Sequence, residues 1–191
     1  MIAEKKSAKT KVPLKFAELF ARSLKDLLEP ACERIEIAGS IRRRKPEVGD
    51  IELVAIPKPT SNLLGDQEYQ TSRIINWIWE KSPPGIKYEP EVKLFSKLGK
   101  FYAQFTWAGM QVDLFMTTPD KWGCIYMIRT GSAGFSRQMM TKRSQGGFCP
   151  DHLCFKDGRL WDGDEVLDTP EEEDVFAHLG VSWLDPTERK G

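Results

Sequence analysis

Apolar residues near the start of the chain recur at spacings of three and four, the period of a helix with one buried face. Pro13 suits the first turn of such a helix, and Pro30 cannot continue it. The pattern therefore predicts an amphipathic helix that begins at Pro13 and ends before Pro30. Its expected buried stripe consists of Leu14, Ala17, Leu19, Phe20, Leu24, Leu27 and Leu28.

Alternating or continuous apolar runs farther along the chain predict strands. The expected strands are residues 34–37, 50–56, 101–107 and 110–116. Pro57 stops the second of them. Ala108-Gly109 separates the last two and suits a two-residue turn, so these runs predict a hairpin.

The remaining segments predict three helices and a turn-rich C-terminal region with short strands and one acidic helix start. The expected helices are 71–81, ended by Pro83-Pro84-Gly85, and 119–129 and 134–144, separated by Thr130-Gly131-Ser132. This order of elements indicates the α+β class, with a larger domain followed by a small α/β subdomain. We expect a flexible basic tail at residues 1–12, a first domain at 13–118 and a second at 119–191.

Net charge changes this picture only when it is divided along the chain. The 191 residues include 28 Lys plus Arg and 28 Asp plus Glu, so the formal charge is zero. Residues 1–150 hold 24 basic and 16 acidic side chains, a net charge of +8, whereas residues 151–191 hold 4 and 12, a net charge of −8. A basic body that faces phosphates explains this division, and so do solvated faces of either sign, so charge alone leaves both open.

Composition excludes several classes of protein. A hydrophobic fraction of 40% with 29% charged residues argues against wholesale disorder. No apolar run approaches the ~18 residues that a membrane span needs, and the basic N-terminus lacks the apolar core of a signal peptide. The four cysteines are too few and too scattered for a disulfide scaffold. We therefore expect an intracellular protein with no membrane partner.

Carboxylates on two of the predicted strands suggest a metal site. Asp50 and Glu52 alternate with apolar residues, so both side chains leave one face of their strand, roughly 7 Å apart. Asp113 lies on the polar face of the 110–116 strand. If the two strands are neighbours, three carboxylates converge, and hard oxygen ligands of this kind suit Mg²⁺. Acidic residues on solvent-exposed faces of two strands would show the same spacing, so spacing alone does not distinguish a metal site from an exposed surface.

A basic turn precedes the first two carboxylates. Gly39-Ser40 offers backbone N–H groups and a hydroxyl to an anion, and Arg42, Arg43 and Arg44 follow directly. A nucleoside triphosphate with bound metal needs both signs of charge side by side. The turn and the carboxylates together therefore predict a nucleotide site.

Four stretches of the chain are similar to family X DNA polymerases, the polymerase beta-like group of the nucleotidyltransferase superfamily. AGSIRRRKPEVGDIE (38–52) resembles the palm signature of that family, and VPLKFAELF (12–20) resembles the helix that opens the palm. QVDLFMTTPDKWGCIYMIRTGSAGFSRQM (111–139) resembles the third-aspartate strand, the next helix, the TGS turn and the helix after it. EEEDVFAHLGVSWLDPTER (171–189) resembles the closing segment. The similarity covers residues 12–190 and implies a nucleotidyltransferase palm, a mixed sheet with flanking helices, followed by a thumb-like subdomain.

The resemblance also implies roles for individual residues. The implied catalytic metal ligands are Asp50, Glu52 and Asp113, which would hold two Mg²⁺ ions that Mn²⁺ can replace. The implied nucleotide-binding residues are Gly39, Ser40, Arg43, Arg129, Gly131, Ser132 and Ser136. The implied DNA-binding residues are Lys97, Lys100 and Arg137.

Several positions depart from the family pattern. Glu52 replaces the more usual second aspartate, and Gln111 stands where an arginine commonly orients the third. Ile128-Arg129 replaces an aromatic pair that commonly excludes ribonucleotides by contact with the sugar. Ser136 stands where an asparagine often contacts the minor-groove edge of the nucleotide. Because the sequence opens directly on the palm, we expect no lyase activity and a weaker hold on DNA.

The implied function is that of a DNA-directed DNA polymerase. It would act as a monomer and add dNMP from a dNTP to a primer 3′-hydroxyl, on primer-template or gapped DNA, in short-gap repair. Small genomes such as those of viruses encode compact versions, so we expect a cytoplasmic protein or a viral protein in a host cell. The alternatives are a nucleotidyltransferase that needs no template or uses RNA or another acceptor, and a catalytically weak module that binds nucleotide or DNA.

Overall fold

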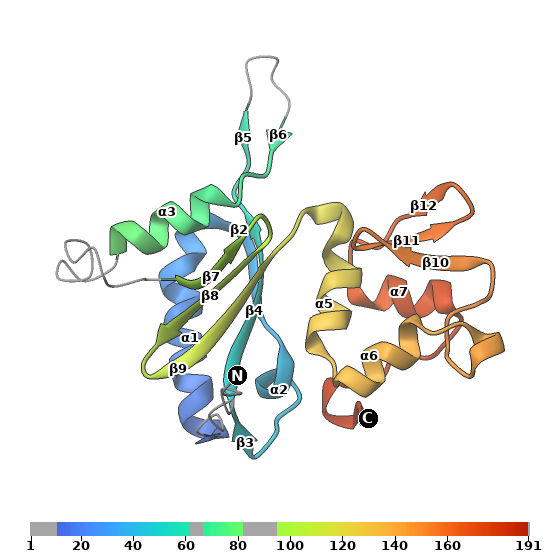
Figure 1. Cartoon of the computed structure of the whole chain (residues 1–191), viewed down its shortest axis with the longest axis horizontal. Coiled ribbons are helices and arrows are strands. Elements are labelled where there is room, and N and C mark those ends of the chain that lie inside the picture. Colours follow the sequence, from blue (N-terminus) through green and yellow to red (C-terminus); the bar gives the residue numbers. More distant parts are fainter. Residues whose placement is uncertain (1–10, 62–66, 82–94, 191) are drawn as a thin grey trace, which may run out of the picture.

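A mixed five-stranded sheet supports the first part of the chain (Figure 1). Its strands lie in the order β2-β4-β9-β8-β7, where β4 and β9 are parallel and the other neighbouring pairs are antiparallel. The strands are β2 (Cys32–Ile37), β4 (Asp50–Pro57), β7 (Phe95–Gly99), β8 (Tyr102–Trp107) and β9 (Met110–Met116). The expected α+β class is confirmed.

The computed structural model describes residues 11–61, 67–81 and 95–190. Of the expected tail over residues 1–12, residues 1–10 lie outside the described residues, as does the predicted helix end at Pro83-Pro84-Gly85, whereas Val12 belongs to a short strand.

Helix α1 (Leu14–Leu28) packs on this sheet together with α3 (Ser72–Lys81). The buried residues of α1 are Ala17, Ala21, Leu24 and Leu28, at spacings of four, three and four. Leu19 was expected in this stripe, and that expectation is wrong because it lies off the stripe and is 60% exposed.

The predicted hairpin is present and its turn explains its register. Ala108 and Gly109 both have positive φ, 49° and 77°, as a type I′ two-residue turn requires. This turn pairs Trp107 with Met110 and, farther along, Gln104 with Asp113. Strand β7 was not predicted, because as the edge strand its residues after Phe95 are exposed and show no apolar alternation.

The second part of the chain forms its own core. It contains α5 (Trp122–Thr130), α6 (Ala133–Met140), α7 (Glu172–Leu179) and a three-stranded sheet of β10 (Leu153–Lys156), β11 (Arg159–Asp162) and β12 (Glu165–Leu167). Helix α6 ends before the predicted residue 144, because Thr141 has an extended backbone and Lys142 forms a bridge with Cys149.

The remaining described elements are short. They are β1 (Val12–Pro13), β3 (Glu47–Val48), β5 (Thr60–Ser61), β6 (Gln67–Glu68), α2 (Gly39–Arg42) and the 3₁₀ turns Glu29–Ala31, Pro119–Lys121, Arg143–Gln145 and Pro186–Glu188. We call the five-stranded sheet with α1, α2 and α3 the N-terminal lobe. We call α5, α6, α7 and β10–β12 the C-terminal lobe; the two stand side by side in Figure 1.

A buried ion cluster joins the lobes. Glu172 of α7 is 1% exposed and accepts hydrogen bonds from Arg42 of α2 at 3.0 and 2.8 Å and from Arg189 at 2.6 Å. Arg42 also stacks on Tyr126, with its guanidinium carbon 3.9 Å from the ring centroid. Nearby, Trp122 is fully buried against apolar residues of β4. The lobes are therefore held together by both apolar packing and paired charges.

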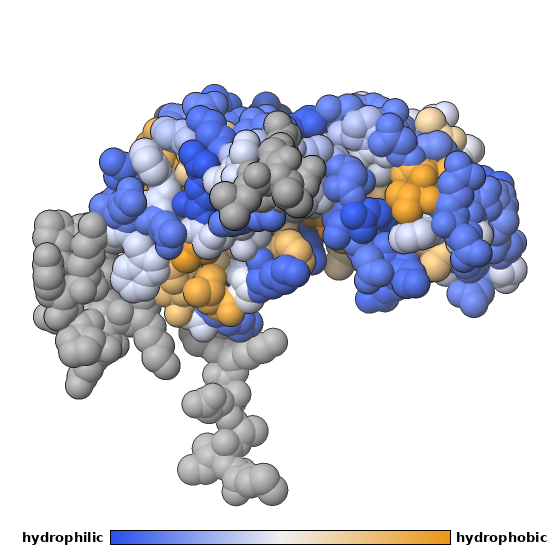
Figure 2. Space-filling view, turned by 90° about the horizontal axis from the view of Figure 1, so that it is seen from above, coloured by the Kyte–Doolittle hydropathy of each residue, from blue (hydrophilic) through white to orange (hydrophobic). Residues whose placement is uncertain are grey.

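The surface is mostly hydrophilic, with small hydrophobic patches over both lobes (Figure 2). Within the ranges that the structure describes, none of the helices has the length and hydropathy that a membrane crossing requires.

Replacing Glu172 with glutamine tests the ion cluster. The substitution leaves Arg42 and the fully buried Arg189 without a counter-charge, and breaking a buried pair in this way costs about 3–5 kcal/mol. We expect Glu172→Gln to lower the free energy of unfolding by about that amount in urea denaturation. Glu173→Gln, an exposed change on the same helix, is the control and should be nearly neutral. Equal effects of the two changes would contradict a stabilising role for the cluster.

Candidate active site

The strands that carry the predicted carboxylates are direct neighbours. In the parallel β4–β9 pair, Glu52 lies opposite Asp113 and Asp50 lies opposite Gln111. The residues that alternate with them on both strands are fully buried, so the three carboxylates leave the other face of the sheet. The structure thus brings Asp50, Glu52 and Asp113 to one area.

Negative charge is concentrated at Glu52. Burial, followed by the charge of Asp50, raises the pKa of Glu52 to about 7, and Asp113 adds to the rise while Arg43 opposes it. A cation bound beside Glu52 would oppose this rise and favour its ionised form.

Three neutral donors hold Asp113. Tyr102 and Gln104, both on β8, donate to Oδ1 at 2.5 and 2.7 Å, and Gln111 donates to Oδ2 at 2.8 Å. Burial and the acceptor Asp113 raise the pKa of Tyr102, so it remains a donor. Sequence reasoning missed Tyr102 and Gln104, although the hairpin turn fixes the register that sets Gln104 beside Asp113.

The donor chemistry of the site fits Mg²⁺, because all three ligands would be carboxylate oxygens. Among the described residues, no group of three or more Asp, Glu, His or Cys side chains is gathered closely enough to hold a metal ion. The ligands are thus adjacent in the sheet without being drawn onto one point.

The basic turn lies directly against the carboxylates. Gly39 begins α2 with φ +61°, and a Cβ at this position would come 1.7 Å from Oε2 of Glu52. Glycine is therefore required for this close approach. In the next residue and one turn after Gly39, Ser40 Oγ and Arg43 Nε are both buried and have no hydrogen-bond partner among the described residues. Buried polar groups are normally paired, so these two donors are available to an anion.

Arg43 also reaches the turn between α5 and α6. One of its terminal nitrogens donates to the carbonyl of Thr130, next to Gly131. Ser132 caps α6 by accepting from the backbone N–H of Phe135, after a cis Gly131–Ser132 peptide bond. Ser136 is apart from these groups, since it is buried and donates to the carbonyl of Ile128.

A cleft of about 580 Å³ opens over Asp113. Arg129 lines it from α5, with its guanidinium carbon 3.9 Å from the centroid of Phe115. Partial burial lowers the pKa of Arg129, and Glu52 opposes that shift. Lys100 lines the same cleft, whereas Lys97 and Arg137 are exposed on β7 and α6 outside its lining.

Known proteins are similar to this chain in sequence and in fold. The DNA polymerase beta thumb family matches residues 126–190. A DNA nucleotidylexotransferase of Eulemur macaco is 29% identical over 86 residues, or 44% of this chain and 16% of the relative, so this chain spans less than a fifth of that relative.

A solved structure extends the match to nearly the whole fold. Polymerase beta of Leishmania infantum, in a ternary P/T complex, matches with a TM-score of 0.69 and 16% identity, over 95% of this chain and 77% of that one. The thumb match and the similar sequence, with a fold shared over nearly the whole chain, indicate a family X polymerase-like protein.

Proposed function

We propose that the chain is a nucleotidyltransferase that adds dNMP to the 3′-hydroxyl of a DNA primer and releases pyrophosphate. The observation that carries the proposal is the contact between acidic side chains and the hydrogen-bond donors of a basic turn. Glu52, which lies opposite Asp113 in the sheet, lies against Gly39, and the unpartnered donors of Ser40 and Arg43 follow within one turn. A metal-bound triphosphate needs both.

The residues divide the work of in-line phosphoryl transfer. Asp50, Glu52 and Asp113 would hold two Mg²⁺ ions, or Mn²⁺ in their place, which when bound lower the pKa of the attacking hydroxyl and neutralise the leaving phosphates. Ser40 and Arg43 would bind the β- and γ-phosphates beside the Gly39 backbone. Tyr102, Gln104 and Gln111 fix the direction in which Asp113 presents its oxygens.

DNA would lie along the basic side of the cleft. Lys97 and Lys100 would contact the primer strand, and Arg137 would lie near the template. Gly131 and Ser132 would lie nearer the incoming nucleotide, whereas the buried hydroxyl of Ser136 already donates to Ile128. The relative of similar fold is described as a ternary P/T complex, which supports a primer and template as partners. Short-gap filling in repair is the role we propose. All four cysteines are free thiols, which supports an intracellular setting, cytoplasmic or in a virus-infected host.

Transfer without a template is the second candidate. Arg129 lines the cleft at a position where the family commonly has an aromatic side chain, and one relative is named a DNA nucleotidylexotransferase. An arginine binds phosphate or sugar through its donors and leaves less bulk to exclude a ribose.

Replacing Asp50 tests the reaction itself. Gapped duplex, primer-template and single strand are each incubated with dNTP or rNTP and Mg²⁺ or Mn²⁺, and extension is followed on gels. We expect templated extension by the wild type and a loss of at least a hundredfold with Asp50→Ala, because a metal ligand is removed. Asp162→Ala, an exposed change on β11, should keep wild-type activity.

The comparison of the three DNA acceptors distinguishes templated transfer from transfer without a template. Extension that does not depend on a template would support the second candidate over the first. Binding of DNA and nucleotide without extension under either metal would overturn both and leave a binding module.

Replacing Ser40 with alanine tests the phosphate contact. Because Ser40 Oγ is buried without a partner, its loss should leave the free energy of unfolding unchanged or slightly higher. We expect the affinity for a non-hydrolysable dNTP analogue, measured by calorimetry, to fall about three- to tenfold. Ser23→Ala on α1 is the control. Unchanged affinity in Ser40→Ala would remove Ser40 from the nucleotide site.

Arg129 tests sugar selection. We expect the wild type to prefer dNTP over rNTP only weakly, measured as the ratio of the two kcat/KM values, because Arg129 stands where the family commonly has an aromatic side chain against the sugar. Arg129→Phe should raise that ratio about tenfold or more, whereas Arg129→Lys should leave it near the wild-type value. A strong preference for dNTP in the wild type would contradict this assignment.

A further inference from the structure

A second cavity of about 320 Å³ adjoins the catalytic cleft between the two lobes. Phe101 lines both spaces. Lys121 and Ile125 line the second cavity, and Arg129 lines the cleft. Lys121 is the N-cap of α5, and the three residues are spaced four apart along that helix. The cavity is therefore a continuation of the cleft along one face of that helix.

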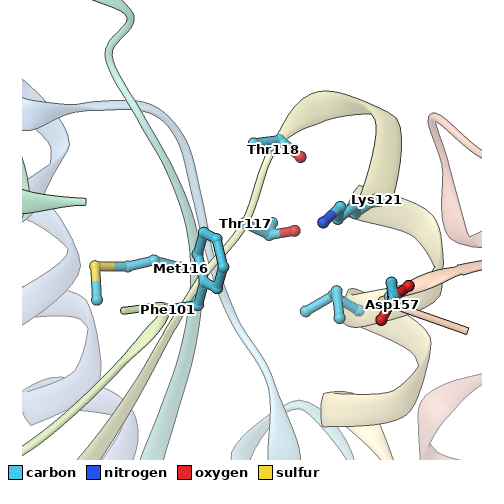
Figure 3. Close-up of a pocket in the computed structure, with 8 residues that line it drawn as sticks. Phe101, Met116, Thr117, Thr118, Lys121 and Asp157 are labelled. Atoms are coloured by element: carbon cyan, nitrogen blue, oxygen red, sulfur yellow. The ribbon is translucent and has the colours of Figure 1, made fainter. Parts of the chain in front are cut away.

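The cavity contains a buried polar group with no partner among the described residues. Thr117 is 4% exposed, and its Oγ1 has no hydrogen-bond partner within the described ranges. Figure 3 shows this hydroxyl directed toward Lys121, across the space from the Phe101 ring. A hydroxyl kept buried and unpaired is costly, so a ligand atom that accepts its proton would be stabilised here.

The rim of the cavity offers a flat apolar surface beside positive charge. The Phe101 ring is 44% exposed, and the ammonium groups of Lys100 and Lys121 lie 5.1 and 5.7 Å from its centroid. An exposed aromatic ring between cations is the combination with which proteins bind unpaired bases, through stacking and phosphate contacts. Stacking of a base exceeds the cation–π contacts that it would replace at an exposed ring.

We propose that this cavity binds an unpaired nucleobase of a DNA strand that runs through the cleft. The base stacks on Phe101, one of its acceptor atoms takes the hydrogen bond of Thr117, and Lys100 and Lys121 bind the adjoining phosphates. The volume is near the lower limit of small-molecule pockets and suits a single base. This inference rests on the proposed function, because it supposes that DNA occupies the cleft.

Fluorescence of 2-aminopurine tests the site without catalysis. A short single-stranded oligonucleotide with 2-aminopurine at its 3′ end is titrated with the full chain in EDTA. We expect quenching on binding, because the probe stacks on a ring. Phe101→Ala should remove the quenching and weaken binding about tenfold. The control Phe16→Ala removes a ring that is 52% exposed on α1 and should change neither.

A second variant separates binding from folding. Thr117→Val keeps the shape of the side chain and removes the unpaired hydroxyl, so we expect an unchanged or higher Tm together with about threefold weaker binding. Wild-type affinity in Thr117→Val and in Phe101→Ala would overturn the proposal.

Two further comparisons complete the test. A free 2-aminopurine nucleotide should bind far more weakly than the strand; equal affinity would replace the strand with a free nucleotide as the ligand. Primer extension is assayed on the same wild-type protein. Extension without 2-aminopurine quenching would overturn the base site and leave the polymerase function intact, whereas quenching lost in Phe101→Ala without extension would support the site and overturn the function.

Discussion

Parallel pairing of β4 with β9 sets Glu52 opposite Asp113, and the candidate site is arranged around that pair. Each strand on its own would be an ordinary amphipathic strand with an acidic face. Side by side they place two carboxylates next to each other, and the charges of Asp50 and Asp113 add to the effect of burial in raising the pKa of Glu52. The nearest basic turn must then approach closely, and it does so through a glycine backbone that no other residue could supply.

Much of this arrangement was predictable because it rests on local patterns. The alternation in residues 50–53 and 110–116 gave both strands and the faces of their carboxylates, and the Ala108-Gly109 turn gave the hairpin register. What the sequence could not give depended on tertiary contacts. Edge strand β7 has no buried face to reveal it, and α6 ends where a bridge to Cys149 takes over. The division of the chain at residue 118 stays a prediction.

The partners of Asp113 illustrate a different limit. The absence of an arginine at Gln111 was visible in the sequence, but its replacement by several neutral donors was not. Tyr102 and Gln104 lie on a strand that was predicted from its apolar residues, so the polar residues on its other face were not considered as partners of Asp113. Neutral donors orient a carboxylate without adding positive charge, which leaves that charge to whatever the site binds.

Helix α2 and the residue after it combine two roles, a proposed phosphate contact and a link to the C-terminal lobe. Ser40 Oγ and, just past the helix, Arg43 Nε are the buried donors that we propose for phosphate, whereas Arg42 between them binds Glu172 of the other lobe. In evolutionary terms these positions cannot drift separately. A backbone change that adapts the turn to another anion would also move Arg42, which binds the C-terminal lobe. We therefore expect variation in substrate to arise at cleft positions that do not link the lobes through the Glu172 cluster, such as Arg129.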